Sequence, residues 1–131
     1  MPRSIPTQRA ILGTIMIVAG IAHFVFPAAY DPMIPDGLPK DAINYLSGAL
    51  EIAFGLGVFV PRFRWWATLG IVLLMIVFLP VHVIDYFREQ PAIGSKLAAA
   101  IRIAVQLVLI WWTWWVHRNS TQERVAEKGA A

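Results

Sequence analysis

The amino-acid sequence predicts an all-α protein, a four-helix transmembrane bundle with both termini cytoplasmic. The 131-residue chain is 58% hydrophobic and only 15% charged, whereas soluble domains usually carry about 25% charged residues. Its apolar residues form four runs close to the roughly 20 residues that cross a bilayer as helix. The runs do not alternate as the strands of a membrane barrel would. We therefore expect a single integral membrane domain over residues 1–131.

Composition also excludes several classes of protein. The chain has no cysteine, which excludes disulfides, thiolate metal sites and a cysteine nucleophile. The net charge of +3 is not arranged as a basic stripe with interleaved aromatics, so we expect no nucleic-acid partner. Basic edges facing the cytoplasm explain this charge better. The expected surroundings are a lipid bilayer.

The first two spans are separated by a proline-rich loop. The first covers residues 10–27 and ends at Pro27; its apolar run is longer than a signal-peptide core, so we expect it to be retained. The loop that follows contains Pro32, Pro35, Gly37 and Pro39, too many helix breakers for a helix to continue. The second span covers residues 42–60, with Asp41 as its expected N-cap.

The third and fourth spans are bounded by equally clear breaks. A tight basic turn at residues 61–64 precedes the third span, residues 65–86, so spans two and three should be antiparallel. Pro80 should bend the third span. The fourth span covers residues 97–116, with Ser95 as a candidate cap. Residues 117–131 are polar and are expected to form a mobile tail.

Basic residues set the expected orientation. Seven lie on the side of the termini and three on the other, which favours an N-in/C-in protein of the plasma (inner) membrane. The six tryptophans fall at the cytoplasmic ends of spans three and four, and the three tyrosines at the opposite boundary. Aromatic rings of this kind prefer the two membrane interfaces.

Glu51 is the principal candidate for a functional site, because a charge in hydrocarbon is costly and seldom kept without a role. It lies roughly 13 Å below the outer end of its span. Gln106 has a similar depth, Arg102 is one turn shallower, and His23 and His82 also lie in the outer half of the bundle. These side chains predict a polar cluster that opens toward the outer face.

The second span also has a face of small and polar residues. By the i, i+3, i+4 rule it includes Asn44, Ser47, Gly48, Glu51 and Gly55. Small residues there allow another helix to approach closely. The candidate ligand-binding residues are therefore Glu51, His23, Arg102, Gln106, Asn44, Ser47 and His82.

Purely structural roles remain open for each residue. Glu51 is either protonated or paired with Arg102 as a staple, and Arg102 could instead reach the outer headgroups. His23 could be a neutral histidine between helices. Gln106 could only bridge helices. His82 and Asp85 lie close enough to the surface to be interfacial.

Three functional interpretations compete with these structural ones. The first is a pocket in which Glu51, Arg102 and His23 orient a polar head such as a quinone ring. The second is a metal site of His23, Glu51 and His82, ligand types that suit zinc, copper or iron, although no metal-binding spacing supports it. The third is a proton relay. Four short spans without a repeat do not favour a complete transporter.

Several stretches of the sequence also resemble a known family. They are Gly20-Ile-Ala-His23-Phe24-Val-Phe-Pro27, Met33-Ile-Pro35, Leu38-Pro39, Ser47-Gly48-Ala-Leu-Glu51, Gly57, Pro61 and Arg64. Together they resemble the DoxX-like family of small four-span membrane proteins, from the first span to the end of the third. His82 departs from the family pattern, since relatives often have asparagine there.

The resemblance implies a four-helix transmembrane bundle associated with redox complexes, because the family is named for a subunit of an archaeal thiosulfate:quinone oxidoreductase. It places His23, Pro27, Ser47, Gly48 and Glu51 at motif positions. We expect a DoxX-type accessory or ligand-binding component of a redox or respiratory process, with a quinone-like or lipid ligand. The alternatives are an assembly or structural subunit, with a membrane protein partner or as a homo-oligomer, and a stand-alone enzyme with a His/Glu site.

Overall fold

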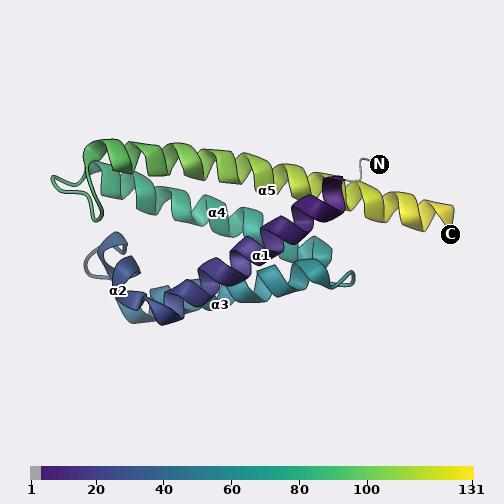
Figure 1. Ribbon diagram of the computed structural model, residues 1–131, viewed down its shortest axis with the longest axis horizontal. Coiled ribbons are helices and arrows are strands. Elements are labelled where there is room, and N and C mark those ends of the chain that lie inside the picture. Colours follow the sequence, from purple (N-terminus) through teal and green to yellow (C-terminus); the bar gives the residue numbers. More distant parts are fainter. Residues whose placement is uncertain (1–3) are drawn as a thin grey trace.

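The computed structural model describes residues 4–131, which form four long helices and two short ones (Figure 1). The elements in chain order are α1 (Ser4–Val25), α2 (Pro27–Tyr30), the 3-10 helix η1 (Asp31–Met33), α3 (Lys40–Phe59), α4 (Arg64–Phe87) and α5 (Lys96–Ala130). No strand occurs within residues 4–131. The all-α prediction is therefore confirmed.

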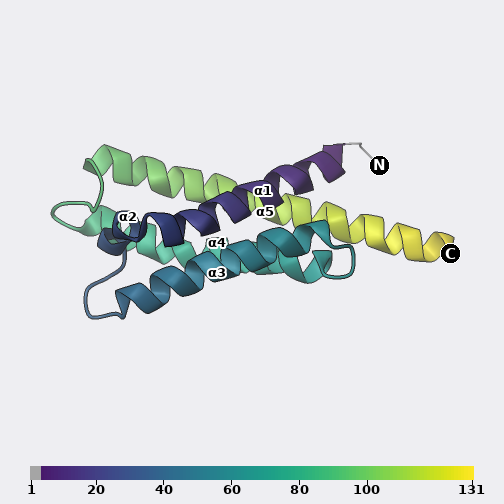
Figure 2. The ribbon, with the colours of Figure 1, turned by 60° about the horizontal axis from the view of Figure 1, so that its bottom comes forward.

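The four long helices are each long and apolar enough to cross a membrane, as expected of a multi-pass membrane protein. Successive long helices run in opposite directions, so α1 begins and α5 ends at the same end of the bundle (Figures 1 and 2). We call this the terminal end; it also holds the α3–α4 turn. The opposite end, called the loop end, holds α2, η1 and the α4–α5 loop.

Helices α1 and α3 form the tightest pair, and glycines make their close approach possible. A Cβ atom on Gly20 would lie 2.6 Å from the Gly48 carbonyl oxygen, and one on Gly48 only 2.6 Å from Cβ of His23. Two turns away, a Cβ on Gly55 would lie 2.8 Å from the carbonyl oxygen of Gly13. Only glycine fits at such distances. The small-residue face of α3 is therefore occupied by α1 of the same chain.

Helix α3 meets α4 in a regular antiparallel register near the terminal end. Gly57 faces Ala67, since a Cβ on Gly57 would lie 2.8 Å from that of Ala67, and Gly70 faces the ring of Phe54 in the same way. The buried core lies here, with Leu12, Met16, Val58, Ile71 and Val116 among its most buried side chains. The apolar core thus fills the terminal half of the bundle.

Helices α4 and α5 form the second pair, with polar contacts inside it. The buried Thr68 hydroxyl lies 2.8 Å from His117 Nδ1, and Gln106 Nε2 donates to the Met75 carbonyl at 2.7 Å. Helix α1 meets α5 near the terminal end, where Arg9 pairs with Glu123 and Trp112 Nε1 donates to Gln8 at 2.9 Å. The two helix pairs, α1/α3 and α4/α5, are thus joined at the terminal end.

The structure corrects two sequence expectations about the helix ends and confirms a third. Residues 117–131, expected as a mobile tail, continue α5 as far as Ala130, and the Arg9–Glu123 pair fixes part of this extension against α1. Asp41 is not the N-cap of α3, because the helix begins at Lys40 after Pro39 and lacks a side-chain cap. Ser95 does cap α5, accepting from the Ala98 amide at 3.2 Å.

The glycine contacts predict a selective effect of volume on stability. Gly48→Val forces new methyl groups against His23 and Gly20, and overpacking of this kind costs about 1–3 kcal/mol. Ala49→Val, on an exposed neighbouring position of the same helix, is the matched control. We expect Gly48→Val to lower the unfolding temperature in detergent and Ala49→Val to leave it unchanged. Equal unfolding temperatures for the two variants would contradict the close α1–α3 packing.

Candidate ligand-binding cavity

A cavity of about 510 Å³ lies at the loop end, between the two helix pairs. This volume is within the range of roughly 300–1,000 Å³ found for small-molecule sites. Most of its wall is apolar. Its polar lining residues are His23, Tyr30, Asn44, Ser47, Glu51, His82 and Arg102. Six of the seven residues predicted from the sequence therefore line one space.

Gln106, the seventh predicted residue, lies apart from the cavity. Its amide is buried between helices and donates to the Met75 carbonyl oxygen at 2.7 Å. The structural interpretation of Gln106, a bridge between α4 and α5, is confirmed.

His23, Asn44 and Glu51 form a buried polar group across the α1–α3 contact. Asn44 Nδ2 donates to the His23 carbonyl at 3.0 Å, and Asn44 Oδ1 lies 2.6 Å from His23 Nδ1. Glu51 Oε2 lies 3.5 Å from His23 Nε2. All three residues are at least nine-tenths buried. The close approach at Gly20 and Gly48 is what brings them together.

Asn44 fixes the tautomer of the His23 ring. Because Asn44 Nδ2 is committed to a backbone carbonyl, the atom facing the ring is the amide oxygen, which only accepts. His23 Nδ1 must therefore carry the hydrogen, and in the neutral ring Nε2 has a free lone pair. An ionised Glu51 is also only an acceptor. With Glu51 ionised, two acceptors face each other at 3.5 Å and can accept from a hydroxyl donor, whereas a protonated Glu51 would itself donate to His23 Nε2.

Tyr30 covers this group from the loop end. Its ring stacks on that of His23, with centroids 3.8 Å apart and planes 19° from parallel. Burial raises the pKa of the Tyr30 phenol, and the negative charge of Glu51 adds to the effect. The phenol therefore stays protonated at neutral pH. Helix α2 thus places a neutral aromatic cover over the polar group.

Three buried polar atoms of the cavity residues lack a hydrogen-bond partner. They are Glu51 Oε2, His82 Nδ1 and Arg102 Nε. A buried polar atom without a partner costs about 1–3 kcal/mol, and most such atoms in native proteins are satisfied. All three belong to residues that line one apolar-walled cavity, which indicates a site for a ligand with polar groups.

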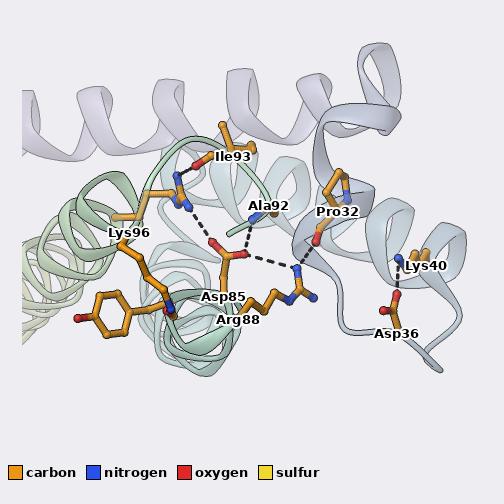
Figure 3. Close-up of polar contacts among 10 residues, drawn as sticks. Pro32, Asp36, Lys40, Asp85, Arg88, Ala92, Ile93 and Lys96 are labelled. Atoms are coloured by element: carbon orange, nitrogen blue, oxygen red, sulfur yellow. Dashed lines mark hydrogen bonds and ion pairs between the residues drawn. The ribbon is translucent and has the colours of Figure 1, made fainter. Parts of the chain in front are cut away.

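Asp85 fixes the position of Arg102 and of the loop beside the cavity, a structural role that was not predicted from the sequence. Its fully buried carboxylate accepts from Arg102 Nη2 and from the Ala92 amide, both at 2.7 Å, and pairs with Arg88 at 3.4 Å. Figure 3 shows Asp85 between Ala92 and Arg88, with Arg88 reaching the Pro32 carbonyl. Asp85 is therefore buried within the protein near the end of α4. Its position near the end of α4 offered no sequence signal for these contacts.

The ion pairs correct one expectation about Glu51. Arg102 does not staple Glu51, because its guanidinium is taken by Asp85 and by the Ile93 carbonyl at 2.8 Å. The partner facing Glu51 is His23. Nor do His23, Glu51 and His82 form a metal site: within residues 4–131 no three His, Asp or Glu side chains are placed to hold an ion.

Comparison with known proteins gives one family. A family model described as a domain of unknown function (DUF8561) matches residues 12–117, a stretch that includes every residue of the polar group. No curated protein and no solved structure matches the chain.

The hydrogen bonds predict the protonation pattern of His23. In the neutral ring, nitrogen-15 spectra should show a protonated Nδ1 and an unprotonated Nε2. Asn44→Ala should change the His23 signals, because the acceptor for Nδ1 is lost, and leave those of His117 unchanged as an internal control. A His23 ring protonated only on Nε2 in the unchanged protein would contradict the assigned network.

Proposed function

Because the chain belongs to the DUF8561 family of domains of unknown function, we propose its function from its own geometry: a membrane-embedded binding protein for a quinone-like molecule. In this proposal it is a DoxX-type accessory component of a redox or respiratory process, in the plasma membrane with both termini cytoplasmic. The single observation that carries the proposal is that three buried polar atoms without partners belong to residues lining one apolar-walled cavity.

The lining offers both kinds of hydrogen-bonding group that a quinol or quinone head needs. His23 Nε2 and the Glu51 carboxylate can accept from a hydroxyl group, and Arg102 Nε can donate to a carbonyl or hydroxyl oxygen. The stacked His23 and Tyr30 rings give a flat aromatic surface beside them. A ring that bears oxygens on opposite sides could use both groups at once.

Charge disfavours a phosphate head. The positive charge of Arg102 is already matched by Asp85 at 2.7 Å, and Glu51 would repel an anion in a poorly screened site. A neutral head with hydroxyl or carbonyl oxygens suits this balance better than a phospholipid. The resemblance to a family with a quinone-linked member supports the same class of ligand.

Substitution of Glu51 tests the proposal. In lipid nanodiscs we expect a decyl-substituted benzoquinol to bind the protein, and Glu51→Leu to weaken binding about 10- to 100-fold, since a buried charge-assisted hydrogen bond contributes about 1.5–3 kcal/mol. Calorimetric titration measures the change. Glu89→Leu, at an exposed position of the loop end, should bind like the unchanged protein.

Thermal unfolding of the same variants separates a binding site from a structural staple. Glu51→Leu removes an unpartnered buried oxygen, so the variant should unfold at the same temperature or a higher one. Undiminished benzoquinol binding by Glu51→Leu would overturn the proposed role of Glu51. A large loss of stability would instead favour the staple.

A further inference from the structure

We propose that the ligand enters from the lipid through an opening between α3 and α4, and that its hydrocarbon tail leaves the cavity there. This inference rests on the proposed function and adds the route and the chemical class of ligand: an amphiphile dissolved in the membrane. The opening lies between Ser47 of α3 and Val77 of α4, both of which line the cavity.

The α3–α4 register locates the opening. Near the terminal end the two helices are in contact at Gly57 with Ala67 and at Phe54 with Gly70. In an antiparallel pair the same register places Ser47 opposite Val77, and Ile43 opposite Val81, two and three turns farther on. All four of these residues line the cavity, which lies beside α3 and α4 at this level. The seam between the helices therefore opens toward the loop end.

The exposure of Val77 places one wall residue of the proposed opening at the outer surface of the bundle. Val77 is 63% exposed although it lines the cavity. It lies ten residues before the end of α4 at Phe87, a rise of about 15 Å along the helix. At that depth an exposed side chain of a membrane-spanning helix faces hydrocarbon. The cavity is thus continuous with the lipid at Val77.

Unlike the side between α3 and α4, the loop end of the cavity is covered by other segments of the chain. Tyr30 stacks on His23, and Ile34, only 7% exposed, lies beside it in the lining. Arg88 joins α4 to the Pro32 carbonyl, and Arg102 joins α5 to the Ile93 carbonyl. These contacts tie the covering segments to the α4/α5 pair. In our proposal, a ligand dissolved in the bilayer therefore enters between α3 and α4, where these covering segments do not lie.

The polar groups and the opening together define the ligand. Glu51 lies one helical turn from Ser47, toward the packed part of the α3–α4 contact. When Glu51 binds the polar head of the ligand, the hydrocarbon tail of that ligand therefore points toward the gap between Ser47 and Val77. The gap has an apolar wall at Val77 and Val81. A linear or isoprenoid hydrocarbon chain fits this path, with the ring inside and the tail in the bilayer.

A pair of probes and a bulky substitution test the route. The probes are a tail-less benzoquinol and the same ring with a decyl chain, both titrated into protein in nanodiscs. Val77→Trp should weaken binding of the decyl compound about tenfold or more, a change of about 1.4 kcal/mol, and leave the tail-less ring bound as before. Ile76→Trp, on an equally apolar exposed position outside the cavity lining, should bind both probes normally.

The outcomes separate this inference from the proposed function. Equal binding of the decyl compound by Val77→Trp and the unchanged protein would overturn the route, while loss of both probes in Glu51→Leu would still support the site. Binding of neither probe by the unchanged protein would overturn the site and the route together. If Val77→Trp does not fold, Ile43→Trp narrows the same opening from α3 and should discriminate the probes in the same way.

Discussion

The close contact of α1 with α3 is the constraint on which the rest of the structure depends. At Gly20 and Gly48 no side chain can stand between the two backbones. The approach presses His23 against α3, where Asn44 and Glu51 lie one turn to either side of Gly48. Asn44 then binds the His23 imidazole through Nδ1 and the His23 backbone through its carbonyl, and the other ring nitrogen faces the Glu51 carboxylate. A single larger residue at either glycine would separate these groups.

The cavity follows from how the two helix pairs meet. Core side chains join α1/α3 to α4/α5 in the terminal half, and beyond Leu50 and Leu74 residues of both α3 and α4 line the cavity. Asp85, fully buried, keeps the far ends of α4 and α5 and the neighbouring loops in place. The protein therefore leaves polar atoms unpartnered in a space that more apolar side chains could have filled. Such an arrangement sacrifices stability, and residues at functional sites commonly do so.

Sequence reasoning predicted the helices and most of the site, because both depend on local rules. Four apolar runs of sufficient length are recognisable without tertiary information, and the face shared by Asn44, Ser47 and Glu51 follows from helix periodicity. Ser95 is a standard capping residue before a helix and could be read directly.

The errors arose where partners come from distant segments. Whether Arg102 meets Glu51 or Asp85 depends on the rotation of α5 against α4, which no local pattern fixes. Gln106 shares the helical face of Arg102, yet one turn more depth brings it against Met75 instead of the cavity. Helix α5 extends beyond the membrane-length run, and Glu123 in this extension pairs with Arg9, far away in the chain. Pairings of this kind are tertiary and had to come from the structure.

An experimental density map of the protein in native lipid is the most direct test of this account. It should show an elongated molecule with a ring between Glu51, His82 and Arg102, and a tail that leaves between Ser47 and Val77. A cavity filled only by ordered water, or one closed by α3 packing against α4 along its whole length, would contradict the account.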